Sequence, residues 1–248
     1  MPLYDTIGLG YAARRRPDPR IAAVIDAALR DASSVVNVGA GTGSYEPTTR
    51  RVVAVEPSTV MISQRASDAA PCLQGVAESL PLETKSVDAA MAVLTMHHWT
   101  DLARGLAELR RVARSHAVLV TWVPDAAPFW LTDDYFPEIV AHDRTVFPAE
   151  RELLAVVERA IGPAHAAPIG IPHDCTDGFL CAYWRRPEAY LRDDVRRAIS
   201  SFSRFDPAAG LTRLRDDLAS GAWRARHGHV LEHDAMDFGY RIVIAEVC

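Results

Sequence analysis

The chain has 248 residues, 49% of them hydrophobic and 24% charged, and a formal net charge of -5. This length and composition predict one globular domain with a sizeable core and exclude long disordered stretches. The acidic balance gives no general attraction to phosphate backbones, so we expect no nucleic-acid partner.

The four cysteines, at positions 72, 175, 181 and 248, form no C-x-x-C pair, so neither a zinc site nor a disulfide framework is predicted. Reduced thiols in a cytoplasm fit this pattern best. The first residues contain no apolar segment before a cleavage site, so no signal peptide is expected, and no apolar run is long enough to span a bilayer. We therefore expect a cytoplasmic protein without a membrane partner, either a monomer or a homodimer.

The first regular helix is expected to begin at Asp18, which offers an N-cap, with Pro19 in the first helical position. Residues 4–17 precede it and include Tyr11. A segment of this kind is free to fold over a ligand, and the alternative is that Tyr11 packs on the domain surface. The apolar residues after Pro19 repeat at helical spacing and predict an amphipathic helix against a sheet, through Ile21, Val24, Ile25, Ala28 and Leu29.

The most informative stretch runs from Val35 to Glu56. Its β-branched start predicts a short buried strand that ends in the turn 39–43, GAGTG, and residues 52–55 predict a second strand. Glycines allow φ > 0 and let the backbone approach a ligand closely. Glu56 ends the second strand, where a carboxylate can accept hydrogen bonds from ribose hydroxyls. Gly43 comes one residue too early for the dinucleotide pattern G-x-G-x-x-G.

Strands and helices continue to alternate up to residue 123. The pattern predicts a helix over 58–67, strands over 72–76 and 87–96, a helix capped by Asp101, and a strand over 117–123. This alternation favours a parallel sheet with right-handed crossovers. A helix over 149–161 and strands over 166–171 and 240–247 complete the predicted core.

The remaining segments predict a cap. Residues 124–147 follow the carboxyl end of a strand and are rich in aromatic side chains, which makes Phe129, Trp130 and Tyr135 candidate walls of a substrate pocket. Residues 172–237 contain ten arginines and eleven acidic residues, and helices are expected over 187–191, 193–202 and 209–226. We expect a single domain with a core of about 18–123, 148–171 and 238–248, and a cap of about 1–17, 124–147 and 172–237.

The glycine turn followed by Glu56 resembles the first two motifs of the class I S-adenosylmethionine-dependent methyltransferases. Two later segments, GVAESLP (75–81) and DAAMAVLTMHHW (88–99), are similar to the ubiquinone and menaquinone biosynthesis-like group of that family. The chain has Asn37 where the family usually has an acidic residue. The resemblance covers residues 35–123. It implies an α/β fold with a Rossmann-like seven-stranded sheet, mostly parallel with an antiparallel last strand.

The resemblance also implies S-adenosyl-L-methionine as cofactor and a small-molecule acceptor as partner. Carried onto this sequence, Ala77 and Glu78 meet the adenine, Leu94 and Thr95 lie by the methionine end, and Tyr11 covers the cofactor. Pro57 and Met61 follow Glu56 at the start of the next predicted helix, where Met61 either contacts the nucleoside or packs in the core. The expected cofactor site is Tyr11, Gly39, Ala40, Gly41, Gly43, Glu56, Pro57, Met61, Ala77, Glu78, Leu94 and Thr95. Trp99 joins Phe129, Trp130 and Tyr135 in the expected substrate pocket.

His97 and His98 end the fourth predicted strand and have two interpretations. Histidine is the side chain best suited to take a proton near pH 7, so one of the two is a candidate general base. The other interpretation is a packing role for the HHW triplet. At most one of the adjacent pair faces the site if the strand alternation holds.

No metal site is expected. His229 and His233 are an i, i+4 pair, but Glu232 does not stand where H-E-x-x-H requires it. Two alternatives to a methyltransferase are a nicotinamide-dependent oxidoreductase on the same sheet and a cofactor-binding protein without turnover.

Overall fold

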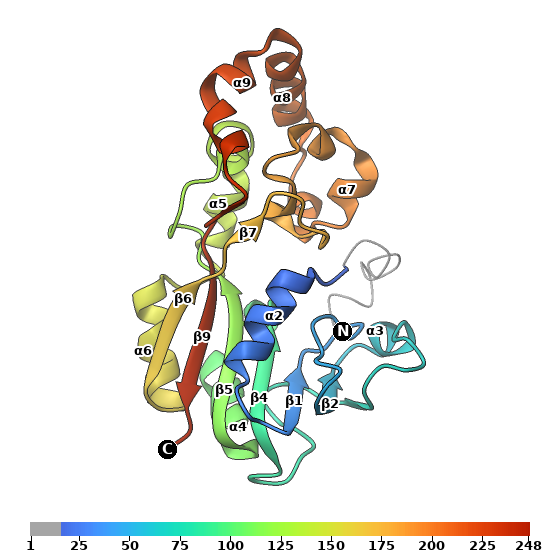
Figure 1. Cartoon of the computed structure of the whole chain (residues 1–248), viewed down its shortest axis with the longest axis vertical. Helices are drawn as coiled ribbons and strands as arrows, with labels where there is room; N and C mark the ends of the chain where they lie inside the picture. The colour runs from blue at the N-terminus through green and yellow to red at the C-terminus, as the bar shows by residue number, and fades with distance from the viewer. Residues whose placement is uncertain (1–15) are drawn as a thin grey trace.

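The computed structural model describes residues 16–248, which form a sheet flanked by helices and a mostly helical cap (Figure 1). The strands are β1 (Ser34–Val38), β2 (Arg51–Glu56), β3 (Cys72–Gln74), β4 (Val87–Val93), β5 (Ala113–Trp122), β6 (Ala164–Pro168), β7 (Ile171–Pro172), β8 (Ala235–Met236) and β9 (Tyr240–Glu246). Seven of them form one sheet in the order β3-β2-β1-β4-β5-β9-β6.

The sheet is parallel from β3 to β5, and β9 is antiparallel to both β5 and β6. The predicted mostly parallel sheet with an antiparallel last strand is therefore confirmed. The chain runs outward from β1 to β3 and returns to form β4 beside β1. The order thus reverses between β1 and β4, and ligands of open α/β sheets bind at such a switch point.

The helices are α2 (Pro19–Ala28), α3 (Thr59–Ser63), α4 (Leu102–Val112), α5 (Pro137–Asp143), α6 (Glu150–Ala160), α7 (Asp193–Arg197), α8 (Ala208–Ser220) and α9 (Ala222–His227). Successive side chains of β1 point to opposite faces of the sheet, and both faces are buried. Val35 packs in one core cluster with Ile25 of α2, whereas Val36 lies in a second cluster with Leu109 of α4 and Val157 of α6.

Two predicted helix starts are found. The Asp18 side chain accepts a hydrogen bond from the Arg20 amide, with Pro19 in the first helical position. The Asp101 side chain accepts one from the Arg104 amide at the start of α4. Both caps satisfy amide groups that have no partner inside the helix.

The cap occupies the upper part of Figure 1 and contains α5, α7, α8 and α9. Its largest segment leaves the core through β7 and returns through β8, and these two strands pair antiparallel, Ile171 with Met236 and Pro172 with Ala235. Its core is aromatic. Trp130 packs edge-on against both Tyr190 and Trp223.

Several predicted boundaries are wrong. The helix expected over 209–226 is two helices, because Gly221 adopts φ +80° between α8 and α9. The helix expected over 193–202 ends at Arg197. The strand expected over 87–96 ends at Val93, because Leu94 adopts φ +51° and residues 96–98 form a 3-10 turn. The helix expected over 58–67 is the five-residue α3, and the strand expected over 166–171 is β6 at 164–168.

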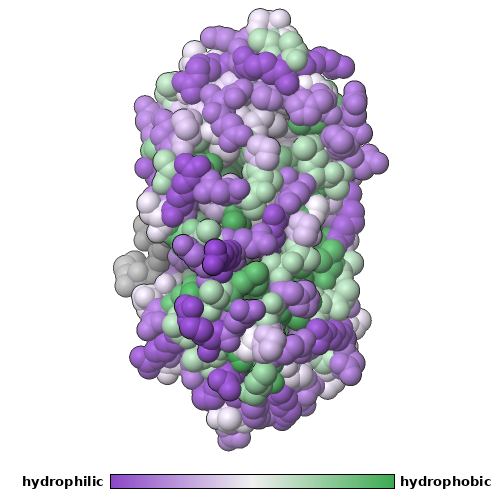
Figure 2. All heavy atoms as spheres, turned by 90° about the vertical axis from the view of Figure 1, so that its left-hand side faces the viewer, coloured by the Kyte–Doolittle hydropathy of each residue, from purple (hydrophilic) through white to green (hydrophobic). Residues whose placement is uncertain are grey.

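The face that carries α6 and β6 shows hydrophobic residues interspersed with hydrophilic ones, and hydrophilic residues predominate over the cap (Figure 2). Among the described residues, no helix combines the length and the apolar character that crossing a membrane requires.

Candidate functional site

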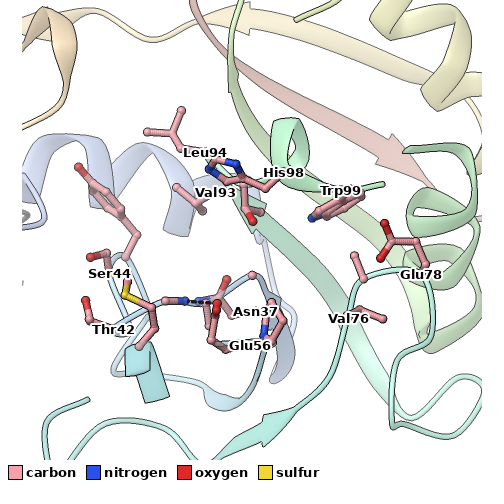
Figure 3. A pocket seen from close by; sticks show the side chains of 18 of the residues that line it. Asn37, Thr42, Ser44, Glu56, Val76, Glu78, Val93, Leu94, His98 and Trp99 are labelled. Atoms are coloured by element: carbon pink, nitrogen blue, oxygen red, sulfur yellow. Dashed lines mark hydrogen bonds between the residues drawn. The ribbon is translucent and has the colours of Figure 1, made fainter. Parts of the chain in front are cut away.

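A cavity of about 580 Å³ opens at the carboxyl ends of β1, β2 and β4, where the strand order reverses. This volume lies in the range of small-molecule and cofactor sites. Of the residues expected to bind the cofactor, those lining it are Gly39, Ala40, Gly41, Glu56, Pro57, Met61, Ala77, Glu78, Leu94 and Thr95. Figure 3 shows Glu56 and Asn37 on one side of this cavity and Leu94 and His98 on the other.

The floor of the cavity is the turn after β1. Gly39 adopts φ +69°, and a Cβ on it would lie 2.0 Å from Thr95 Oγ1. Gly41 adopts φ +53°, and a Cβ there would lie 3.3 Å from Met61 Cε. The amides of Gly39 and Ala40 donate to the Val55 carbonyl at 2.8 and 3.1 Å, which ties the turn to the end of β2. Glycine is therefore required at Gly39 by both its conformation and the space around it.

Glu56 is buried at the end of β2, with its carboxylate held in one orientation. Its Oε2 accepts a 2.8 Å hydrogen bond from the Gly41 amide, and its Oε1 accepts a 2.9 Å bond from the Ser58 amide. Each carboxylate oxygen has capacity for further hydrogen bonds. Two such oxygens, fixed at the edge of a cavity, match a pair of adjacent ribose hydroxyls.

A second carboxylate lies beneath the turn. Glu46 forms an ion pair with Arg65 at 2.7 Å, with 9% and 5% of the two side chains exposed. Asn37 Nδ2 donates to Glu46 Oε1 at 3.1 Å, and Arg65 Nη1 donates to the Gly41 carbonyl at 3.3 Å. Gly43 borders this pair and does not line the cavity, since a Cβ on it would lie 3.2 Å from both Arg65 and Glu46. The structure thus gives Gly43 a packing role in place of the expected cofactor contact.

Glu78 borders the opposite end of the cavity, but its carboxylate is engaged in hydrogen bonds within the protein. Its Oε1 accepts bonds from the Thr100 amide and hydroxyl and from the Asp101 amide, at 2.6, 2.9 and 3.1 Å. Burial alone would raise the pKa of Glu78, but these hydrogen bonds outweigh it and leave the pKa below its ordinary value. Glu78 therefore fixes the segment that follows Trp99. Trp99 itself lines the cavity.

The two histidines lie on the 3-10 turn Met96–His98 and face different spaces. His98 lines the 580 Å³ cavity, whereas His97 lines a separate cavity of about 80 Å³ under the cap. Their rings are 3.8 Å apart, and His97 also packs against Phe147. Burial, reinforced by the positive charge of Arg204, lowers the pKa of His98 to about 4. His98 is therefore neutral at pH 7.

The predicted aromatic walls lie elsewhere. Phe129, Trp130 and Tyr135 are buried in the cap and line neither of these two cavities. Trp130 Nε1 donates to the Trp184 carbonyl, and the Tyr135 hydroxyl donates to Asp217. These three side chains therefore pack inside the cap and do not form the wall of either cavity. Trp99 lines the cavity as expected, and Tyr11 lies outside the described residues.

Sequence reasoning missed Tyr45. It adopts φ +63° just after the glycine turn and lines the cavity, and its hydroxyl donates to Asp177 Oδ2 of the cap at 2.8 Å. No sequence motif marks it. The described residues contain no group of three or more histidine, cysteine or acidic side chains able to hold a metal ion.

Comparison with known proteins shows the family of this chain. A family model described as a methyltransferase domain matches residues 36–121. A crystal structure from Anabaena variabilis, of a protein assigned as a methyltransferase of an antibiotic biosynthesis pathway, superposes with a TM-score of 0.86. It is 34% identical to this chain, and the match covers 94% of this chain and 98% of the other.

Two further matches are more limited. An uncharacterised methyltransferase of Mycobacterium tuberculosis is 41% identical over 91 residues, which are 34% of this chain and about a third, 36%, of that protein. The geranyl diphosphate C-methyltransferase of Streptomyces coelicolor, solved with S-adenosyl-L-homocysteine, has a TM-score of 0.52 at 16% identity. The match covers 93% of this chain and 76% of the other, and this likeness shows the fold alone.

The chain therefore belongs to the class I S-adenosylmethionine-dependent methyltransferases. The cavity fits the cofactor of that family. The fixed carboxylate of Glu56 suits the ribose diol, and Gly41 leaves the turn open where a larger side chain would project toward Met61.

Proposed function

We propose that this protein transfers the methyl group of S-adenosylmethionine to a small-molecule acceptor. One observation carries the proposal: the Glu56 carboxylate, fixed by the Gly41 and Ser58 amides, lies across a 580 Å³ cavity from Leu94 and His98. This spacing leaves room for a nucleoside on the Glu56 side and for a reacting centre on the other. The cofactor, when bound, supplies a methyl group on a positively charged sulfur.

The residues of this chain act by binding and orienting. Glu56 and the glycine turn hold the nucleoside, and Ala77 and Trp99 border its far end. Leu94 and His98 form the wall that faces the cap. Alignment of nucleophile, methyl carbon and sulfur is a positioning task, and well-oriented groups contribute on the order of 7 to 11 kcal/mol to such reactions.

His98 supports transfer as an uncharged wall. A histidine with a pKa of about 4 carries no charge at pH 7 and so does not repel a sulfonium beside it. The same pKa makes it a poor general base at neutral pH, because a base works best when its pKa lies near the working pH. We therefore assign catalysis to proximity and orientation.

The acceptor is proposed to be a small molecule and not a nucleic acid. The segment 172–237, which provides most of the cap, carries ten arginines and eleven acidic residues and offers no excess of positive charge to a phosphate backbone. The net charge of -5 agrees with this view.

The cofactor part of the proposal is tested by calorimetric titration of the Glu56→Gln variant with S-adenosylmethionine. We expect affinity to fall by about 1.5 to 3 kcal/mol, because the amide cannot accept with both of its terminal atoms. Glu83→Gln, at an exposed turn, is the matched control and should bind normally. Equal affinity of the wild type and Glu56→Gln would remove Glu56 from the cofactor site.

Turnover is tested separately with tritiated S-adenosylmethionine and a broad acceptor mixture. Formation of S-adenosylhomocysteine that depends on an acceptor supports the proposed function. A wild-type protein that binds the cofactor and forms no product with any acceptor fraction would contradict it.

A further inference from the structure

We propose that the 80 Å³ cavity under the cap binds the acid group of the acceptor, and that Arg204 selects acceptors that carry a carboxylate. This inference rests on the proposed function and adds the chemical class of the substrate. It places the acid at one end of the acceptor and the atom to be methylated at the other, facing the larger cavity.

The small cavity lies between the sheet and the cap. Leu94, Trp122 and Tyr240 contribute from strand ends, and residues 198–201 and Arg204 contribute from the cap. Leu94 lines both cavities and is therefore their shared boundary. It adopts φ +51°, a conformation that leucine rarely takes and that recurs at ligand sites. In the proposed arrangement, the acceptor passes Leu94 and its other end lies beside His98, which lines the larger cavity.

The polar end of the small cavity is formed by Arg204 and Asp143. Arg204 Nη1 donates to Asp143 Oδ1 at 3.1 Å, and 28% and 3% of the two side chains are exposed. Within the described part of the chain this is the one hydrogen bond that Arg204 makes. A guanidinium has five N–H donors in a planar fork, so most of its donors remain available at this cavity.

The donor set points to an anion with two acceptor atoms. Beside Arg204, the hydroxyl-bearing Ser200 and Ser201 line the cavity, and the single carboxylate there, Asp143, is already engaged by Arg204. Arginine binds carboxylates through two parallel hydrogen bonds, which a planar carboxylate fits. The cavity volume of about 80 Å³ is several times the roughly 10 to 15 Å³ that one water molecule needs, which leaves room for a group of a few atoms.

The walls restrict what adjoins the acid. Trp122, Phe147, Phe179 and Tyr240 line the cavity with aromatic surface, and Trp122 packs edge-on against Phe147. Such surfaces favour an apolar or aromatic body next to the charged group. The acceptor class is therefore a small aromatic or apolar acid with a nucleophile remote from its carboxylate.

For a hydroxy acid, the chemistry balances without another reactant. The hydroxyl oxygen forms the new bond to the methyl carbon, the bond between that carbon and sulfur breaks with its electron pair on sulfur, and the hydroxyl proton is released to water. Arg204 touches the acid and sets specificity.

The ion pair offers a test with opposite outcomes for its two members. Arg204→Gln removes the anion-binding group, whereas Asp143→Asn removes the carboxylate that competes with the acceptor for the same guanidinium. Because a buried pair that loses one charge can destabilise the fold, the double variant Asp143→Asn with Arg204→Gln is measured as well. Arg215→Gln, at an exposed position of α8, is the control for loss of a cap arginine.

The experiment measures methyl transfer from tritiated S-adenosylmethionine to a panel of hydroxybenzoates, hydroxycinnamates and short hydroxyalkanoates, each paired with its neutral amide. The wild type and Arg215→Gln are expected to methylate acids at least tenfold faster than their amides. Arg204→Gln and the double variant should lose this preference, and Asp143→Asn should keep or increase it. Thermal unfolding of each variant verifies that the compared proteins are folded.

Three results overturn the inference: faster transfer to amides, no transfer to any acid, or an unchanged acid preference in folded Arg204→Gln or in the double variant. Failure of the proposed function gives different results from these three. If the protein is not a methyltransferase of small molecules, calorimetry would find no S-adenosylmethionine binding to the wild type, or the acceptor mixture would yield no product at all.

Discussion

Asn37 Nδ2 donates a 3.1 Å hydrogen bond to Glu46 Oε1, and that carboxylate is paired with Arg65 beneath the glycine turn. Members of this family usually carry an acidic residue at the position of Asn37, which is the feature in which the sequence departs from their pattern. The structure supplies the negative charge from residue 46, on the far side of the turn. An amide at position 37 is the neutral donor that this arrangement needs.

Restoring the usual acidic residue is therefore expected to harm this protein. Asn37→Asp places a second carboxylate against Glu46, and like charges at hydrogen-bond distance raise one pKa and cost about 1 to 3 kcal/mol. Urea denaturation should show this loss, and calorimetry should show weaker S-adenosylmethionine binding. Adding Glu46→Gln to Asn37→Asp removes the repulsion and should recover at least half of both losses. Wild-type behaviour of Asn37→Asp alone would show that the two groups do not interact.

Gly39→Ala is expected to weaken cofactor binding by more than about thirtyfold. The new methyl would lie 2.0 Å from Thr95 Oγ1 and in the left-handed region, so the turn must move away from β4. Gly221→Ala is a matched control, since Gly221 also has a positive φ, of +80°, but no atom lies within 4 Å of a Cβ at that position. It should cost about 1 kcal/mol of stability and leave binding intact. Equal effects of the two variants in calorimetry would refute the steric argument.

Gly105→Ala tests the wall formed by Trp99. In the middle of α4 an alanine would by itself stabilise the helix by about 1 kcal/mol. A Cβ at Gly105, however, would lie 2.4 Å from Trp99 Cε3, so the ring must shift at the edge of the cavity. We expect weaker S-adenosylmethionine binding and no gain in thermal stability. Combining the change with Trp99→Phe makes room and should restore stability. A stabilised Gly105→Ala variant with normal binding would be inconsistent with this packing.

The low pKa of His98 predicts a pH dependence of stability. Its pKa is about 4 in the folded protein against an ordinary 6.5, so its contribution is complete above pH 6.5 and is lost as the pH falls toward 4. Between pH 7.5 and pH 5 the free energy of unfolding should fall by on the order of 2 kcal/mol from this residue. In His98→Asn, urea denaturation at the two pH values should show a smaller decrease.

The same variant separates packing from proton transfer. Turnover per folded molecule in His98→Asn should fall by less than about tenfold, below the 10² to 10⁴ that general acid–base catalysis contributes. A loss of 10² or more, together with removal of an acidic limb from the rate profile, would instead make His98 the base.

The sheet and the cofactor end of the site could be predicted because their determinants are local. Val35 and Val36 predict a buried strand, and the glycines that follow predict the turn at its end. Glu56 lies a short distance further along the chain. Helix caps such as Asp18 are equally local, since the side chain bonds an amide two residues away. Such features need no knowledge of the tertiary structure.

The contacts within the cap and between the sheet and the cap could not be predicted, because they join segments that lie far apart in the sequence. Asp143 and Arg204 meet across 61 positions, and Tyr45 and Asp177 across 132. Phe129 and Trp130 are aromatic, as the walls of a pocket often are, but nothing in the sequence shows that they pack inside the cap instead. Hydrophobic composition identifies buried residues without saying which neighbours bury them.

The pairing of β7 with β8 has a consequence for how this protein can diversify. The segment 173–234 departs and returns at neighbouring residues, because Ile171 pairs with Met236 and Pro172 with Ala235. A segment with adjacent ends can be lengthened, shortened or exchanged without altering the order of the seven strands. It carries Arg204, whereas Glu56 and the glycine turn belong to the sheet. If Arg204 selects the acceptor as proposed, substrate choice can change through this segment while the cofactor site in the sheet stays the same.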